Sequence, residues 1–172
     1  MTSSVLSNAA SHFADAHAAR RAVAVSLPLI ENAMRDPSVC GSGFLVIVVM
    51  DPARPPSTHR FEDAILHEHV IGDRSRWDAD YSAFARAKAQ LAWQHQMDSH
   101  AVQALRPHLV RETETLLWGS VCLDGIVVGV SGAHAWWDES FATTVAGALR
   151  AIAKERHAEA LAARQLFAGP RD

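Results

Sequence analysis

Hydrophobic residues follow two different periodicities along this chain. The continuous apolar run Phe44–Met50 is bounded by Gly41-Ser-Gly and Asp51-Pro52, which is typical of a strand buried on both faces. We therefore expect it to be central in a sheet. The next segment, Ile65–Ile71, alternates instead, which predicts a half-exposed strand. One side carries Leu66, Glu68 and Val70, and the other carries Ile65, His67, His69 and Ile71.

After residue 80 the spacing becomes helical. Asp78 or Asp80 can cap the start of a helix, and a second short helix over Ala101–Leu105 should be stopped by Pro107. One face of the first of these helices carries Tyr81, Phe84, Ala85, Lys88, Leu91, Ala92 and His95. Trp93 lies off this face, so we expect it to face a partner chain.

A β-hairpin is predicted in the last third of the chain. Two β-branched apolar runs, Leu116–Leu123 and Ile126–Ser131, flank Asp124-Gly125, a dipeptide that tolerates the positive φ angles of a tight turn. A final helix should start at Asp138 and carry an apolar face before a charged tail.

The first part of the chain predicts a helical arm followed by one domain. Residues 1–25 are rich in Ala, Ser and His, and Pro28 should lie in the first turn of a separate helix capped by Ser26. We expect an arm over 1–25, a single α/β domain over 26–160 and a tail over 161–172.

Composition narrows the possible partners. The 172 residues are 49% hydrophobic, with a formal net charge of −3, so neither nucleic acid nor a membrane surface is expected as a partner. The two cysteines have no metal or redox spacing, and no signal peptide or membrane-spanning run is evident. These features predict a soluble, cytoplasmic protein.

Several motifs resemble the GlcG/HbpS family, which includes the C-terminal domain of PduO-type proteins. The buried strand ending at Asp51, the helix with Lys88-Ala89, and the hairpin Asp124–Gly132 followed by Asp138 occur in the order typical of that family. The chain departs from the pattern before the hairpin, at Thr115–Trp118, and after it, at Ala133–Trp137.

The resemblance implies an α+β fold, similar to profilin or PAS domains, with an antiparallel sheet of about five strands and helices packed on it. It also implies a homo-oligomer. Family members are described as haem binders, as partners encoded in catabolic operons and, among distant relatives, as lyases of hydroxylamino-aromatic acids.

The candidate site combines aromatic, basic and acidic side chains around the hairpin. Aromatic walls can stabilise a cationic ring, an Arg can hold a carboxylate, and a Glu/His pair can move protons. The expected catalytic residues are His134, Glu112 and Glu114, and the expected substrate-binding residues are Trp118, Trp136, Trp137, Arg106, Arg111 and Lys88.

Three functions remain open from the sequence. The leading hypothesis is a cofactor-free lyase that acts on a small hydroxylamino-aromatic carboxylic acid. The alternative is a haem or tetrapyrrole binder in which His134, His95 or Met97 is the axial ligand. In the third, the Trp residues form a subunit interface. His67 and His69 could ligate a metal if a third ligand arrived from elsewhere, but the sequence indicates none, and no metal is expected.

Overall fold

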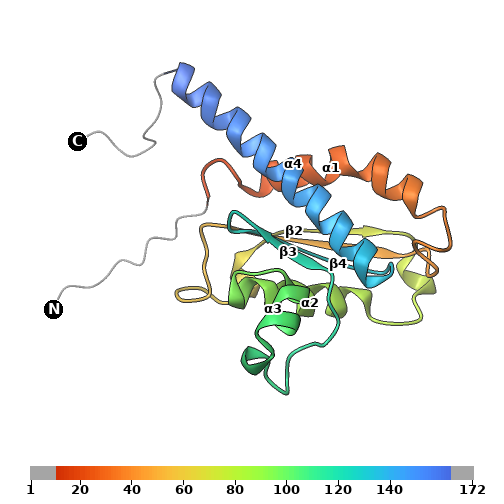
Figure 1. The fold of residues 1–172 in the computed structure, drawn as a ribbon. Coiled ribbons are helices and arrows are strands. Elements are labelled where there is room, and N and C mark those ends of the chain that lie inside the picture. The colour runs from red at the N-terminus through yellow and green to blue at the C-terminus, as the bar shows by residue number, and fades with distance from the viewer. Residues whose placement is uncertain (1–10, 164–172) are drawn as a thin grey trace.

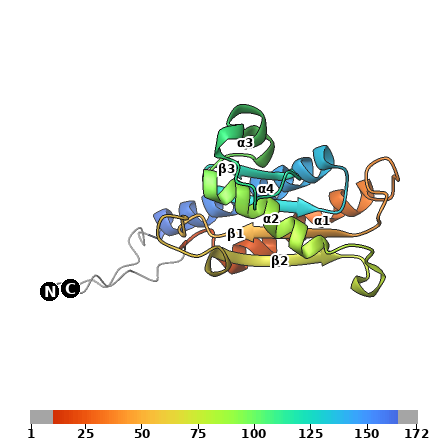
Figure 2. The same cartoon turned by 90° about the horizontal axis from the view of Figure 1, so that it is seen from below.

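The computed structural model describes residues 11–163, which form an antiparallel sheet between two helical layers (Figure 1). Helices α1 and α4 cover one face, and α2 packs on the other (Figures 1 and 2). In chain order the helices and strands are α1 Ala16–Ala33, β1 Leu45–Met50, β2 Ile65–Ile71, α2 Tyr81–His95, α3 Ser99–Leu105, β3 Ser120–Leu123, β4 Ile126–Ser131 and α4 Ala135–Ala162. Short 3-10 turns occur at Glu62–Ala64, Arg74–Arg76 and Pro107–Leu109.

The sheet has the order β2-β1-β4-β3, and every neighbouring pair is antiparallel. The expected α+β architecture is confirmed, with four strands in the described residues rather than about five. Every residue of β1 is buried, which confirms its central position. Asp124 and Gly125 adopt φ angles of 52° and 81° and make the tight turn between β3 and β4.

Each face of the sheet has its own hydrophobic core because side chains alternate along β1 and β4. The core under α1 and α4 takes Leu45, Ile47, Val49, Val128 and Val130 from these strands. The core under α2 takes Val46, Val48, Met50 and Val127. A chain with two apolar sheet faces needs both helical layers, so the fold is a three-layer sandwich.

Strand β2 contains a bulge that changes which residues share a face. His67 pairs with Val49 and Ile65 pairs with Met50, so an extra residue, Leu66, is accommodated between them. Leu66 therefore packs with the α1 and α4 core and Ile65 with the α2 core. The expected strict alternation is wrong for these two residues.

Helix α1 starts earlier than the sequence suggested. Asp15 caps it by accepting a hydrogen bond from the Ala18 amide at 2.9 Å, and the helix continues through Pro28. The expectation that Pro28 lies in a first turn capped by Ser26 is wrong. Pro28 is exposed, and buried Val23 and Ile30 on either side of it pack into the core, which stabilises the helix despite the proline.

Three further expectations are corrected by the structure. Strand β3 begins at Ser120 instead of Leu116, and α4 begins at Ala135 instead of Asp138, so Trp136 and Trp137 belong to the first turn of a helix. Trp93 is buried and donates from Nε1 to the Arg54 carbonyl at 2.8 Å, so it does not face a partner chain. Local spacing could not show that the Arg54 loop would cover it.

Helix α2 approaches β4 closely at Gly129, and this contact gives a test of the packing. A Cβ at Gly129 would lie 2.7 Å from the Ala85 carbonyl oxygen and 2.7 Å from the Ala89 Cβ. Gly129→Ala should therefore lower the free energy of unfolding by about 1–3 kcal/mol, measured by urea denaturation. Gly147→Ala is the control, because nothing lies within 4 Å of its Cβ position, and it should raise stability by about 0.5–1 kcal/mol. Equal stability of the two variants would contradict this account.

Candidate functional site

A buried ion pair joins the two helical layers at one end of the sheet. Lys88 on α2 and Asp138 on α4 are 4% and 1% exposed, and the Lys88 Nζ donates to Asp138 Oδ2 at 2.7 Å. Nζ also donates to the Val130 carbonyl at 3.2 Å, and Asp138 Oδ1 accepts from the Ala133 amide at 2.9 Å. Lys88, which we expected to bind substrate, is enclosed in the framework of the fold.

The absence of a side chain at Gly119 leaves space for the ion pair between Lys88 and Asp138. Its φ angle is +139°, and a Cβ there would lie 2.6 Å from the Asp138 Cβ and 3.3 Å from the Lys88 Nζ. Both the backbone conformation and the contact favour glycine. Ser99 holds this segment through its Oγ, which accepts from the amides of Gly119 at 3.2 Å and Ser120 at 3.1 Å.

Burial dominates the electrostatics of this pair. It raises the pKa of Asp138 to about 6, although Lys88 and the Ala133 amide act in the opposite direction. A buried carboxylate loses the solvation that stabilises its charge. The ion pair therefore joins the two layers, and the free energy needed to keep the buried carboxylate charged depends on pH.

The expected aromatic site residues lie in different environments. His134 stacks on Trp136 with ring centroids 5.0 Å apart and planes at 10°, and Trp136 is 60% exposed. Trp137 instead packs against the core and stacks on Phe141 at 6.2 Å. Trp118 is half-buried, with its ring 4.5 Å from that of His100.

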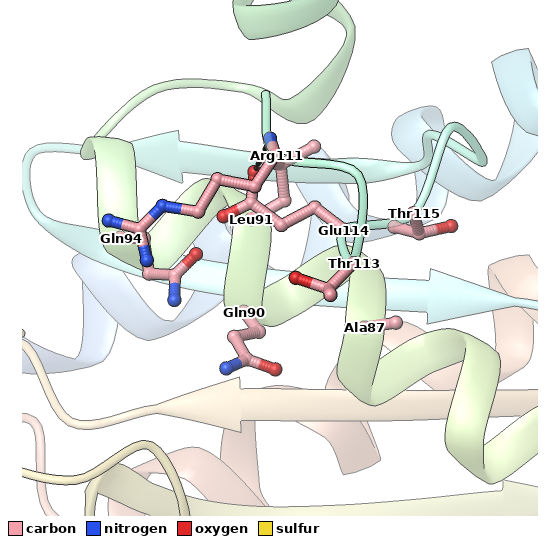
Figure 3. Close-up of a pocket in the computed structure, with 8 residues that line it drawn as sticks. All are labelled: Ala87, Gln90, Leu91, Gln94, Arg111, Thr113, Glu114 and Thr115. Atoms are coloured by element: carbon pink, nitrogen blue, oxygen red, sulfur yellow. Dashed lines mark hydrogen bonds between the residues drawn. The ribbon is translucent and has the colours of Figure 1, made fainter. Parts of the chain in front are cut away.

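Arg111 and Glu114 line one pocket of about 260 Å³ between α2 and the segment that precedes β3 (Figure 3). Figure 3 shows the Arg111 side chain extending over α2 toward Gln94. The Arg111 amide donates to Glu114 Oε2 at 2.8 Å, which fixes the carboxylate relative to the loop. The remaining lining residues are Ala87, Gln90, Leu91, Gln94, Thr113 and Thr115. Arg106 and Glu112 are exposed and are not among the lining residues.

One polar atom of α2 lacks a partner near this pocket. Gln94 Oε1 is buried and accepts no hydrogen bond within residues 11–163. A buried polar atom without a partner costs free energy, so Gln94 is held here by its packing and not by a hydrogen bond from its carbonyl oxygen. The pocket thus combines a cation, a carboxylate and an amide, which suits a small polar acid better than an apolar molecule.

Sequence reasoning missed Gln90 and Gln94. They are four residues apart and so share one face of α2. A polar pair at this spacing indicates a polar face on the helix, opposite the apolar face that packs on the sheet. Only the fold shows that the 111–115 segment lies against this polar face.

A second missed residue is Glu139, near α3 and β3. Burial raises the pKa of Glu139, the nearby Asp98 raises it further and His100 lowers it. Its Oε2 is buried without a hydrogen-bond partner in the described part of the chain. Glu139 directly follows Asp138 in α4, so it lies at the same end of the sheet as the Lys88–Asp138 pair.

The side chains expected as axial ligands do not fit a haem. A haem needs an apolar slot with an axial ligand aimed into it, whereas His134 lies stacked on the exposed Trp136. Protein atoms enclose the Nε2 of His95, so an iron could not approach that side of the ring. Met97 is half-buried just beyond α2 and does not line the pocket of Figure 3.

Residues 11–163 contain no helix with the length and apolar character needed to cross a bilayer. Within the same range, no three His, Cys, Asp or Glu side chains surround a common metal position.

Removing one partner of the buried pair should lower the free energy of unfolding more than removing both charges. Lys88→Met leaves a buried carboxylate without its cation, and we expect a loss of about 3–5 kcal/mol in the free energy of unfolding at pH 7.5. Adding Asp138→Asn to this variant should recover part of the loss. Urea denaturation of both variants measures the effect, and a double variant no more stable than the single one would contradict it.

The raised pKa of Asp138 gives a pH dependence with a definite sign. Between pH 6 and the ordinary value of 3.8, the folded state keeps a proton that the unfolded state has released, so this group stabilises the fold as pH falls. Relative to Asp138→Asn, the wild-type protein should gain at most about 3 kcal/mol between pH 7 and pH 4. Denaturation across this range, with the variant as the reference, measures the gain. A relative loss on acidification would show that the carboxyl group is instead stabilised in its charged form.

Comparisons of the chain with protein-family models, curated proteins and solved structures found no match.

Proposed function

We propose that this protein is a small-molecule enzyme of the lyase type, with its reaction site in the pocket between α2 and residues 111–115. The observation that carries the proposal is that Arg111 and Glu114 line the same pocket. An arginine can hold a carboxylate through two parallel hydrogen bonds, and a glutamic acid can deliver a proton. The pair therefore suits an acid substrate that must be protonated to react.

The pocket dimensions favour a small substrate. A volume of about 260 Å³ lies just below the usual range for small-molecule sites, about 300–1,000 Å³. Leu91 and Ala87 supply apolar contacts on the α2 side, and Gln90 and Gln94 supply amides. A single-ring aromatic acid with one polar substituent has the matching size and chemistry.

The substrate class we propose is a hydroxylamino-aromatic carboxylic acid. Arg111 holds the carboxylate, and Glu114 protonates the N–OH oxygen so that it leaves as water. One water then adds to the ring cation, and a second hydrolyses the resulting imine with release of ammonia. The net reaction consumes one water and releases one ammonia. The substrate follows from the family resemblance, and the assignment of roles follows from the pocket.

The proposed machinery differs from the arrangement expected from the sequence. His134 and Trp136 stack on each other at the start of α4, and Trp137 packs on the core. Neither Trp lines the Arg111 pocket. The ring cation is therefore stabilised by the Glu114 carboxylate, formed when its proton is transferred, instead of by Trp faces.

Substitutions at the pocket and matched substitutions outside it test the proposal. Ammonia release from a panel of hydroxylamino-aromatic acids is measured for wild type, Arg111→Gln and Glu114→Gln. Loss of the charged hydrogen bonds should raise KM about 10- to 100-fold in Arg111→Gln. Loss of the acid should lower kcat about 10²- to 10⁴-fold in Glu114→Gln, whose amide oxygen can still accept from the Arg111 amide.

Arg106→Gln and Glu112→Gln are the controls, because both side chains are exposed outside the pocket and have the same charges. They should retain wild-type kinetics. Activity lost in the controls but kept in the pocket variants would place the site elsewhere. A panel on which the wild-type protein releases no ammonia would refute the lyase.

A further inference from the structure

Strand β2 forms one edge of the sheet and is not paired on its outer side. In the described residues it is hydrogen-bonded only to β1, and Figure 2 shows no helix or strand beyond it. All seven of its residues are half-buried. An edge strand of this length presents unpaired amides and carbonyls that can bind another strand.

His67 and His69 lie side by side on the face of β2 that is directed toward α1. His67 pairs with Val49 and His69 with Ile47, both of which face the α1 and α4 core, and the two imidazole centroids are 6.1 Å apart. Two imidazoles on one face of a strand can both act as ligands of a transition metal.

The charges on α1 next to these two histidines have opposite signs. Arg20 lies close enough to His67 to lower its pKa, and Glu31 lies close enough to His69 to raise it. Both side chains are exposed, and they are eleven positions apart along the helix. On α1, Arg20 therefore lies toward the His67 end of the β2 edge and Glu31 toward the His69 end, where Arg35 lines a surface pocket together with Glu31 and Ile71.

We propose that a second copy of this chain pairs antiparallel along β2, around a two-fold axis through Glu68, and that His67 and His69 of both copies bind one zinc ion. The resulting sheet has eight strands. In this register His67 lies opposite His69 of the second copy, at the separation of about 5 Å typical of cross-strand neighbours. Four imidazoles then gather on one face, which is a suitable set for a tetrahedral zinc ion.

Charge complementarity favours a second copy over another partner. The two-fold axis that places His67 opposite His69 also directs Arg20 toward Glu31 of the second copy, because each charge lies beside one of the histidines. The same contact forms twice, as a symmetric interface requires. A strand from an unrelated protein would not in general place a negative charge opposite Arg20 and a positive charge opposite Glu31.

Glu68 is compatible with a position on the axis. Its side chain lies on the other face of β2, where Oε2 accepts from Arg86 Nε at 2.7 Å and Oε1 lies 3.8 Å from Arg74 Nη2. Ser82 Oγ also donates to Oε1 at 3.2 Å. Two Glu68 carboxylates can approach each other because each is already compensated by two guanidinium groups.

The second copy also completes the metal site. Within residues 11–163, no third ligand converges with His67 and His69 on a metal position. A strand His-x-His pair from one chain supplies two ligands, and the symmetric pair supplies the other two. Zinc binding and dimer formation are therefore coupled.

Sedimentation velocity of the full chain with zinc chloride or with EDTA tests the inference. Zinc should lower the dimer dissociation constant at least tenfold, with one zinc bound per two chains. His67→Asn/His69→Asn should abolish the effect, and His108→Asn/His157→Asn, which changes two exposed histidines away from β2, should retain it. A zinc effect that is absent in wild type, or unchanged in the β2 variant, would overturn the proposal.

A charge exchange tests the two-fold geometry independently of the metal ligands. Arg20→Glu places like charges at both ends of the interface and should weaken the zinc-dependent dimer at least tenfold. Adding Glu31→Arg restores opposite charges and should recover the wild-type dissociation constant. If the double variant remains as weak as Arg20→Glu, the proposed orientation is incorrect. Circular dichroism of each variant confirms that the fold is retained.

Discussion

The buried ion pair between Lys88 and Asp138 is the constraint on which the arrangement of the layers depends. These side chains come from helices on opposite faces of the sheet, and they meet beside Gly119 just before the edge strand β3. Such a pair must satisfy its remaining hydrogen-bonding atoms locally, and the Val130 carbonyl and Ala133 amide do so. The position of α2, the start of α4 and the path into β3 are therefore fixed together.

The pocket lined by Arg111 and Glu114 and the exposed edge of β2 lie in different parts of the molecule. The segment that precedes Gly119 and β3 lies against α2, where Arg111 and Glu114 form the pocket with the polar face of the helix. The β2 edge lies at the other side of the sheet, with central strands between them. A ligand in the pocket and a second copy at the β2 edge can therefore be accommodated at the same time.

Much of the fold could be predicted from the sequence, because strands, helix caps and tight turns depend on residues that are close together in the chain. The apolar run of β1 and the Asp124-Gly125 turn each depend on neighbouring residues, and both were confirmed. Of the two caps expected for α2, Asp78 or Asp80, the structure has Asp80. Strand β3 is shorter and α4 longer than expected. Gly119, just before β3, packs closely against Asp138 in the first turns of α4, a contact between distant segments that local spacing does not reveal.

The candidate site was only partly accessible from the sequence. The sequence by itself determined the buried strand, the hairpin turn, the helix cap and the presence of Arg, Glu, His and Trp side chains around the hairpin, and the antiparallel α+β class was expected from the family resemblance. Only the tertiary structure decided which of them meet: Arg111 and Glu114 share a pocket, whereas His134 and Trp136 stack on the surface. The physical reason is that periodicity and turn chemistry act over a few residues, while a pocket is formed by segments that are distant along the chain.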